Sequence, residues 1–214
     1  METLRKILEL LYFVTGGPVL ALVAFFALKQ ITVAKQASKT ASLRDAYRLA
    51  AEQANSYATE IVPKLNELDQ ELKENDVTFL DDAKIIVSQY RVEVERAPGN
   101  VDVDKLVAII PAFAQAINRL ETFSLFFTSR VADERIAFSS VGTTFVSSVK
   151  PLLPLLVISA NNGNHENLIK LFLLWNHRLE TQKLEREKGS IEARLREMKP
   201  RELYPIGVSG RGNV

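Results

Sequence analysis

The side chains that most often carry enzyme chemistry are scarce in this sequence. It has no cysteine, and its two histidines, His165 and His177, lack the H-E-x-x-H spacing or the nearby second ligand that a zinc site needs. Neither is preceded at four to six residues by an arginine, the charge-and-base pair that small helical ribonucleases use. No Walker-type loop, GxGxxG turn or GxSxG elbow occurs. We therefore predict no catalytic, cofactor or metal site and no enzymatic activity.

One polar cluster stands out because it lies within an apolar helical stretch of the predicted bundle, residues 103–130. Asn118 and Glu121 are three positions apart and share one face of a helix. They can form a buried polar node with Arg130 or Arg135, because buried polar groups must be paired. Such a node fixes the register of packed helices, or it contacts a small ligand. The second possibility gives an alternative function, a helical enzyme or nucleotide-signal sensor.

Two pairs of adjacent acidic residues are further candidates for catalytic or metal-binding groups. Asp81 and Asp82 form one pair, and Asp133 and Glu134 form the other. Adjacent residues on a helix point about 100° apart, so the two carboxylates of a pair cannot readily share a substrate or a metal ion. We expect both pairs in the first turns of helices, where the helix dipole favours negative charge.

The sequence predicts a membrane anchor near its beginning. From Leu10 to Leu28, 19 residues pass without a charge, and as a helix they reach about 28 Å, enough to cross a bilayer core. Gly16, Gly17 and Pro18 allow a kink or close helix packing there. A cleaved signal peptide and a buried core helix are the alternatives, but the stretch is long for a signal peptide and runs on into a helical pattern. Residues 1–29 are thus assigned to a tail and a transmembrane helix.

Charge sets the expected orientation and partners. The chain has 27 Lys and Arg against 26 Asp and Glu, which gives no bulk attraction to nucleic acid. Two basic residues precede the apolar stretch, and five follow it within about 20 residues, namely Lys29, Lys35, Lys39, Arg44 and Arg48. The positive-inside rule therefore predicts an inner-membrane protein with its N-terminus outside and its C-terminal domain in the cytoplasm. The expected partners are the lipid bilayer, further copies of the chain and an unidentified protein, with no specific nucleic acid.

The remaining sequence has helical periodicity, which predicts an all-α fold with one N-terminal transmembrane helix, a cytoplasmic helical bundle and a long charged C-terminal helix. We expect a juxtamembrane helix over 30–75 with a kink near Pro63, a bundle over 76–202 and a disordered tail over 203–214. The helices of the bundle are expected over residues 79–90, 103–130, 133–150 and 165–198.

A second membrane span is an alternative for residues 138–160, which carry Lys150 as their one charge. Six Ser and Thr residues within 139–148, together with two prolines, favour a buried helix of the bundle instead.

Three short motifs carry a resemblance to a known family. They are Ala116–Ser124, which contains N-x-x-E, Val131–Ile136, which contains D-E-x-I, and Leu174–Leu179, which contains the single tryptophan. With them, most of residues 5–180 resembles a widespread bacterial family of small proteins with an N-terminal membrane helix and a helical cytoplasmic domain, catalogued only as a domain of unknown function. The sequence departs from that family at Lys150–Pro151 and in the Gly-rich tail. The resemblance implies the anchored helical fold and no particular activity.

Two functional hypotheses follow. The first is a non-enzymatic, membrane-anchored interaction or effector protein that self-associates at the cytoplasmic face of the bacterial membrane, in phage defence or a stress response. Its membrane and oligomer face would consist of small residues, namely Gly16, Gly17, Ala34, Ala37 and Ala41. The second is the enzyme or nucleotide sensor built on Asn118, Glu121 and an arginine. With one apolar span per chain, a pore would require a ring of copies.

Overall fold

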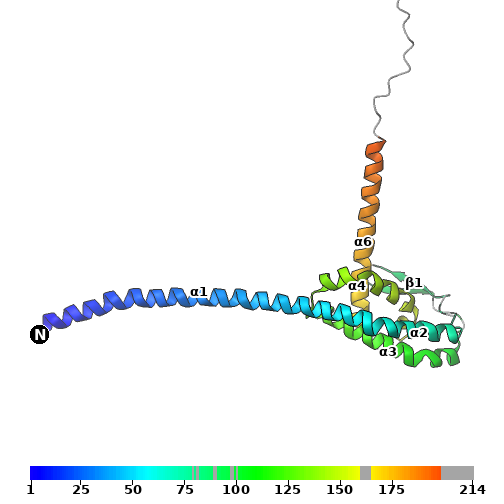
Figure 1. Cartoon of the computed structure of the whole chain (residues 1–214), viewed down its shortest axis with the longest axis horizontal. Helices are drawn as coiled ribbons and strands as arrows, with labels where there is room; N and C mark the ends of the chain where they lie inside the picture. Colours follow the sequence, from blue (N-terminus) through cyan, green and yellow to red (C-terminus); the bar gives the residue numbers. More distant parts are fainter. Residues whose placement is uncertain are drawn as a thin grey trace, which may run out of the picture.

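The computed structural model describes residues 1–78, 80, 82–88, 91–96, 99, 101–159 and 165–198, with residues 15–18, 158 and 159 described by their backbone alone. The protein is mostly helical, with 84% helix and 5% strand. Its elements are α1 (Glu2–Ser56), η1 (Tyr57–Ile61), α2 (Val62–Glu74), β1 (Lys84–Val87), β2 (Val92–Arg96), α3 (Val103–Thr128), α4 (Glu134–Val149), η2 (Lys150–Leu152), α5 (Leu153–Ser159) and α6 (Glu166–Glu197). Figure 1 shows a helical head from which α1 extends to one side while α6 projects transverse to it.

Helix α1 runs as one element from the N-terminus into the head. Residues 19–62 contain neither Gly nor Pro, the two residue types that most disfavour a helix interior. A π-helical turn, η1, then joins α1 to α2, whose second residue is Pro63. Proline has no N–H to donate to the preceding turn, and the irregular turn lies directly before it. The kink near Pro63 stays a prediction, and the irregular turn η1 ends two residues before that proline.

The helix predicted over residues 79–90 is wrong. Its described part contains β1, which pairs antiparallel with β2 so that Ile85 lies opposite Val94 and Val87 opposite Val92. Ile85 and Val87 pack on the core, whereas Ile86 between them is 43% exposed, the two-residue alternation of a strand. β-branched residues favour this geometry, and a short apolar run does not by itself distinguish a strand from a helix.

The strand also corrects the interpretation of the first acidic pair. Asp82 lies in a turn shortly before β1, so no helix begins there, and Asp81 is outside the described residues. The second pair does stand at a helix start. The Asp133 side chain caps α4 by accepting hydrogen bonds from the backbone N–H groups of Arg135 (3.0 Å) and Ile136 (3.1 Å), and Glu134 is the first residue of the helix.

The core of the head is built around aromatic side chains from four elements. Trp175 of α6 is fully buried, with its ring centroid 4.9 Å from that of Phe145 in α4 and 6.1 Å from that of Phe123 in α3. Tyr57 of η1 lies 5.2 Å from Phe123. Because each ring comes from a different element, the cluster holds the α1–α2 junction, α3, α4 and α6 together. The helices predicted over 103–130, 133–150 and 165–198 are present as α3, α4 and α6.

Within the part of the chain that the structure describes, two helical stretches are long and apolar enough to cross a membrane. The first lies within Glu2–Glu74, and none of its most apolar window is buried in the protein. The second is Glu134–Val157, whose window is 56% buried and contributes Phe145 and Val149 to the core. The first stretch is therefore a candidate membrane span by length and composition, whereas the second has the burial of a helix in the head.

Candidate functional site

Glu121, the centre of the predicted polar node, belongs to α3, and its side chain reaches the start of α6. Its Oε1 accepts hydrogen bonds from the backbone N–H (3.3 Å) and the side-chain amide (2.7 Å) of Asn167, and its Oε2 accepts one from the backbone N–H of Leu168 (2.8 Å). A carboxylate at this place satisfies free N–H groups and complements the helix dipole. Glu166, the first residue of α6, is exposed, and the hydrogen bond and charge of Lys170 lower its pKa.

Asn118 does not join this cap. It is exposed on α3, where it lines an open groove of about 410 Å³ together with Lys64 and Arg119. Both cations are already paired, because Lys64 Nζ lies 2.6 Å from Glu67 Oε2 and Arg119 Nη1 lies 3.1 Å from Glu60 Oε2. Asn118 and Glu121 are therefore in different environments, because Asn118 is exposed whereas Glu121 contacts the start of α6.

Neither arginine of the predicted node reaches it. Arg130 is exposed in the loop after α3, with a left-handed backbone (φ 61°), and it lines an open groove of about 590 Å³ beside Arg48 of α1. Arg135 is exposed in the first turn of α4. Within the described part of the chain, no hydrogen bond or ion pair joins either arginine to Asn118 or Glu121. The four residues of the node therefore do not form one site.

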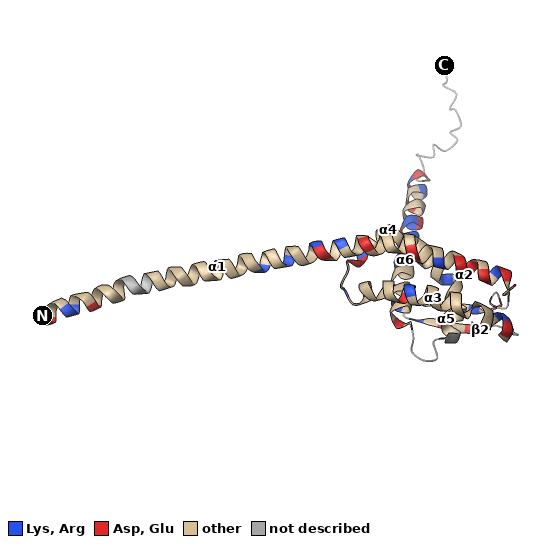
Figure 2. Ribbon diagram, turned by 60° about the horizontal axis from the view of Figure 1, so that its bottom comes forward, with Lys and Arg blue, Asp and Glu red and all other residues tan. Residues whose placement is uncertain are grey.

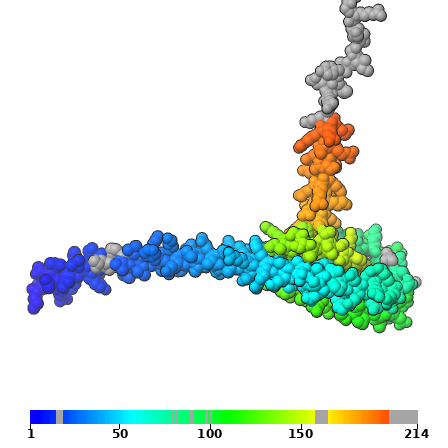
Figure 3. Space-filling model, viewed as in Figure 1, coloured from blue at the N-terminus to red at the C-terminus, as the bar shows by residue number. Residues whose placement is uncertain are grey.

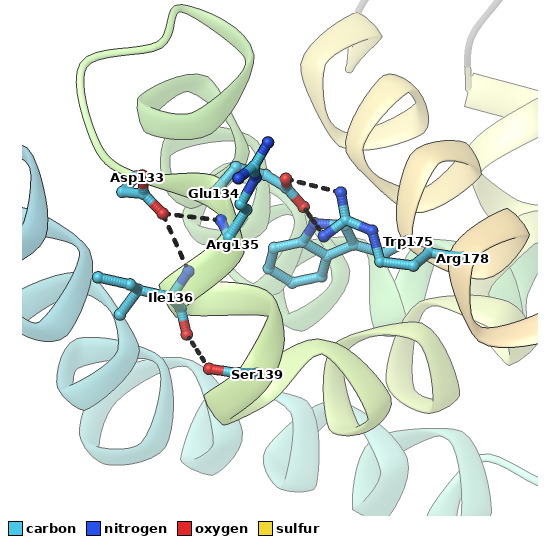
Figure 4. A network of polar contacts seen from close by, with 7 residues as sticks. All are labelled: Asp133, Glu134, Arg135, Ile136, Ser139, Trp175 and Arg178. Carbon is cyan, nitrogen blue, oxygen red and sulfur yellow. Dashed lines mark hydrogen bonds and ion pairs between the residues drawn. The ribbon is translucent and has the colours of Figure 1, made fainter. Parts of the chain in front are cut away.

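The main polar centre of the head lies instead between α4 and α6. Glu134 Oε1 accepts hydrogen bonds from Trp175 Nε1 (2.5 Å) and Arg178 Nη1 (2.9 Å), and its Oε2 accepts one from Arg178 Nη2 (2.9 Å). Figure 4 shows both donors reaching the carboxylate from α6. The side chains of Arg178 and Glu134 are only 31% and 19% exposed. A two-pronged, charge-assisted contact with this much shielding is stronger than an ordinary surface ion pair.

Aromatic rings extend this centre. The guanidinium carbon of Arg178 lies 4.6 Å from the ring centroid of Phe138, and that ring meets Trp175 edge to face at 5.8 Å. Gly142, one turn further along α4, leaves space for the ring, because a Cβ at this position would lie 2.5 Å from Phe138 Cδ2. We call Glu134, Phe138, Trp175 and Arg178 the α4–α6 clamp, because together they fix the direction in which α6 leaves the head.

Sequence reasoning missed this clamp. Glu134 was assigned to the dipole of its helix, and nothing in the sequence points to partners 41 and 44 residues away. One partial signal exists, because Trp175 and Arg178 are three apart and share a helix face. A buried ring next to an arginine on the same face suggests a buried acceptor, without indicating which carboxylate supplies it.

These groups hold two helices together through hydrogen bonds and an ion pair. The Glu134 carboxylate already accepts three hydrogen bonds from α6. In the described residues, no three His, Cys, Asp or Glu side chains lie close enough together to hold a metal ion. Tyr57 is 1% exposed, and its hydroxyl makes no hydrogen bond to any residue that the structure describes. Burial raises the pKa of Tyr57, and the nearby Ser148 side chain offsets part of that rise.

The predicted membrane and oligomer face lies on α1. Ala34, Ala37 and Ala41 are exposed on the part of the helix between the apolar stretch and the head, while the surroundings of Gly16 and Gly17 are outside what the structure describes. Figure 2 shows charged residues at the N-terminal end of α1, then a long stretch without charge, and charged residues again in the second half of the helix. The uncharged stretch of α1 therefore has charged residues on both sides of it along one helix.

The second half of α6 is also exposed. Every residue from Lys183 to Met198 is exposed, and Figure 3 shows this part of the helix standing clear of the head. Two ion pairs lie along it, Lys183 with Glu187 (4.0 Å) and Lys188 with Glu192 (3.9 Å). Among the described residues, the N-terminal part of α1 and the C-terminal part of α6 are thus helical segments that lie exposed away from the head.

Comparison of the chain with protein-family models, with curated proteins and with solved structures finds no match. The resemblance to the bacterial anchored family stays a prediction.

Proposed function

We propose that this chain is a membrane-anchored, non-enzymatic interaction protein, which self-associates and binds a protein partner at the cytoplasmic face of the bacterial inner membrane. The apolar part of α1 crosses the bilayer, the following part of the same helix forms a stalk, and the head carries the interacting surfaces. The roles of phage defence or stress response stay predictions.

The observation that carries the proposal is the exposure of the apolar part of α1. Twelve described large apolar side chains lie between Leu10 and Leu28, and every one is more than half exposed. Exposure of this surface to water would be unfavourable, since removing one large apolar side chain from water lowers the free energy by about 1.5–3 kcal/mol. For twelve partly covered side chains the gain on entering lipid is on the order of 10–20 kcal/mol. A bilayer is the environment that covers all sides of such a helix at once.

The continuity of α1 supports a stalk rather than a loose tether. Residues 30–45 belong to the same helix and are exposed throughout, and the helix first bonds to the head where the backbone N–H of Asp133 donates to the carbonyl of Ala46 (3.1 Å). From Lys29 to Ala46 the helix rises about 25 Å. The clamp then fixes α6 transverse to this stalk (Figure 1). A rigid stalk and a fixed projecting helix suit a protein that presents surfaces to partners.

The membrane anchor is tested by fractionating cells that express the full-length chain. We expect the protein in the carbonate-washed membrane fraction, with the head digested by protease in inverted vesicles and protected in intact spheroplasts. A double variant, Leu20→Asp with Val23→Asp, should release it, because each acidic residue at a span centre costs roughly 2.5–3.5 kcal/mol.

The matched control places the same two changes on the stalk, as Ile31→Asp with Leu43→Asp, where both side chains are exposed. This variant should stay in the membrane. Protein that washes off membranes in the unchanged form, or a mass showing that the apolar stretch has been removed, would refute the anchor. Self-association is tested by light scattering of the detergent-solubilised protein, in which a monomer at all concentrations would contradict it.

The alternative function has less support because its residues are separated. Asn118 faces solvent, Glu121 caps α6, and neither bonds to Arg130 or Arg135. A nucleotide sensor would need these groups to converge on one ligand. A nucleotide-induced rise in melting temperature that disappears in Asn118→Leu would favour this alternative over the interaction protein.

A further inference from the structure

The projecting half of α6 carries an apolar seam. Leu184, Ile191, Leu195 and Met198 are 63%, 55%, 60% and 75% exposed. With Lys188 they follow the alternating spacing of four and three residues that places side chains along one side of a helix in a coiled coil. An exposed helix with one apolar seam and charges on its flanks has the pattern of a helix that pairs with another helix in a coiled coil.

We propose that residues 180–198 of α6 pair with the same segment of a second copy as an antiparallel two-stranded coiled coil. This inference rests on the proposed membrane anchor, and it identifies the surface through which anchored copies associate. The exposed part is short, about 30 Å of helix, and fewer than three heptads pair weakly in free solution. Anchoring in one membrane raises the effective concentration of the two segments, which makes a short seam sufficient.

Symmetry favours the antiparallel arrangement. In a parallel pair of identical helices the two-fold axis runs along α6 and reverses every direction transverse to it. Because α1 is transverse to α6 (Figure 1), the two anchors would then point in opposite directions and could not enter the same membrane. In an antiparallel pair the two-fold axis is perpendicular to α6 and can run along α1. Both anchors then point the same way into one bilayer.

The positions of the seam residues favour the same arrangement. An antiparallel pair centred between Lys188 and Ile191 places Leu184 against Leu195 of the second copy at both ends. On one flank, Glu187 lies beside Arg194 of the second copy, which is an attractive pair. On the other flank Glu185 faces Glu192, whose charge is offset by Lys188 within its own chain (3.9 Å). A parallel pair would instead bring Glu187 beside Glu192 of the second copy, and the attractive contact between Glu187 and Arg194 would be lost.

Cysteine cross-linking tests the pairing directly, because the natural sequence has no cysteine. Two full-length single-cysteine variants, Leu184→Cys with a size tag and Leu195→Cys without one, are reconstituted together in lipid vesicles and treated with a short bifunctional maleimide. The antiparallel pair predicts mainly the mixed product, several-fold above the products that each variant forms alone. Both positions are exposed in the single chain, so the substitutions leave the head intact.

The matched control is Ala193→Cys, which lies on the side of the helix opposite the seam. Mixed cross-linking no higher than that of two Ala193→Cys copies would overturn the proposal. If Leu184→Cys cross-linked to a second Leu184→Cys copy more than to Leu195→Cys, the antiparallel direction would be overturned. The vesicles are floated on a density gradient before cross-linking, which separates two failures. Floating protein without the mixed product refutes this pairing alone, whereas protein that does not float refutes the anchor and this inference with it.

Discussion

Removing the Glu134 carboxylate should destabilise the head strongly. In Glu134→Ala, Arg178 loses both charge-assisted hydrogen bonds and the Trp175 N–H loses its acceptor in the core. A hydrogen bond to a charged group contributes about 1.5–3 kcal/mol, and an unpaired buried donor costs about 1–3 kcal/mol. Because Arg178 is 31% exposed, water replaces part of the loss. We therefore expect the free energy of unfolding to fall by about 2–3 kcal/mol.

Glu134→Gln separates the two contributions. Its carbonyl oxygen still accepts the Trp175 hydrogen bond but no longer carries the charge that holds Arg178, so we expect a loss of about 1–2 kcal/mol. The control is Glu60→Ala, which removes the ion pair between Glu60 and Arg119 on the surface, where the two side chains are 50% and 62% exposed. That pair should contribute less than about 0.5 kcal/mol.

The assay is urea unfolding of the detergent-solubilised protein, followed by the fluorescence of Trp175, the single tryptophan of the chain. Circular dichroism of the helices provides a second probe, because substitutions at Glu134 can alter the tryptophan signal directly. If Glu134→Ala unfolds within about 0.5 kcal/mol of the wild type, as Glu60→Ala should, the clamp does not hold α4 to α6 and the reasoning fails.

Further predictions concern Glu121, Tyr57 and two glycines, of which Gly189 lies on the part of α6 outside the head. Glu121→Ala should lower the free energy of unfolding by about 1–2 kcal/mol, because it removes the cap at the start of α6, and fraying of α6 should appear in amide hydrogen exchange. Tyr57→Phe should leave stability unchanged or raise it by up to about 1 kcal/mol, because the buried hydroxyl makes no hydrogen bond within the described part of the chain. Since burial raises the pKa of Tyr57, the folded state keeps its proton above the ordinary pKa of about 10, and wild-type stability should fall more steeply with rising pH beyond that value than that of Tyr57→Phe. Gly142→Ala should destabilise the head by about 1–3 kcal/mol in thermal unfolding, because the Phe138 ring must leave its place. Gly189→Ala, where the added methyl group meets nothing, should instead stabilise α6 by about 0.5–1 kcal/mol. A loss on Tyr57→Phe, or equal effects of the two glycine changes, would contradict the packing described.

The helices were predictable because their signals are local. Asp102 and Asp133 cap α3 and α4 through backbone groups two and three residues away, and such short-range pairs are visible in the sequence. The hairpin was missed because the run Ile85–Val87 is too short to show a period. Its strand conformation depends on pairing with Val92 and Val94, which a short local run does not indicate.

The candidate site was only partly predictable. Glu121 was singled out as a polar group that needs a partner, and its partners proved to be N–H groups at the start of α6 rather than an arginine. Two of the three donors are backbone N–H groups, which do not appear as residue types in a sequence. The clamp between Glu134 and Arg178 depends on how α4 and α6 cross, which is a property of the packed core.

The length of the stalk has an electrostatic consequence. On the proposed insertion, the exposed helical residues 30–45 place the head about 25 Å above the membrane surface. The Debye length at physiological ionic strength is about 8 Å, so the field of anionic lipids is screened to a few per cent over that distance. Lys29 and Lys35 remain within reach of the lipid charge, whereas the head and α6 are outside it. The affinity of the head for a partner should then be independent of the proportion of anionic lipid in the bilayer.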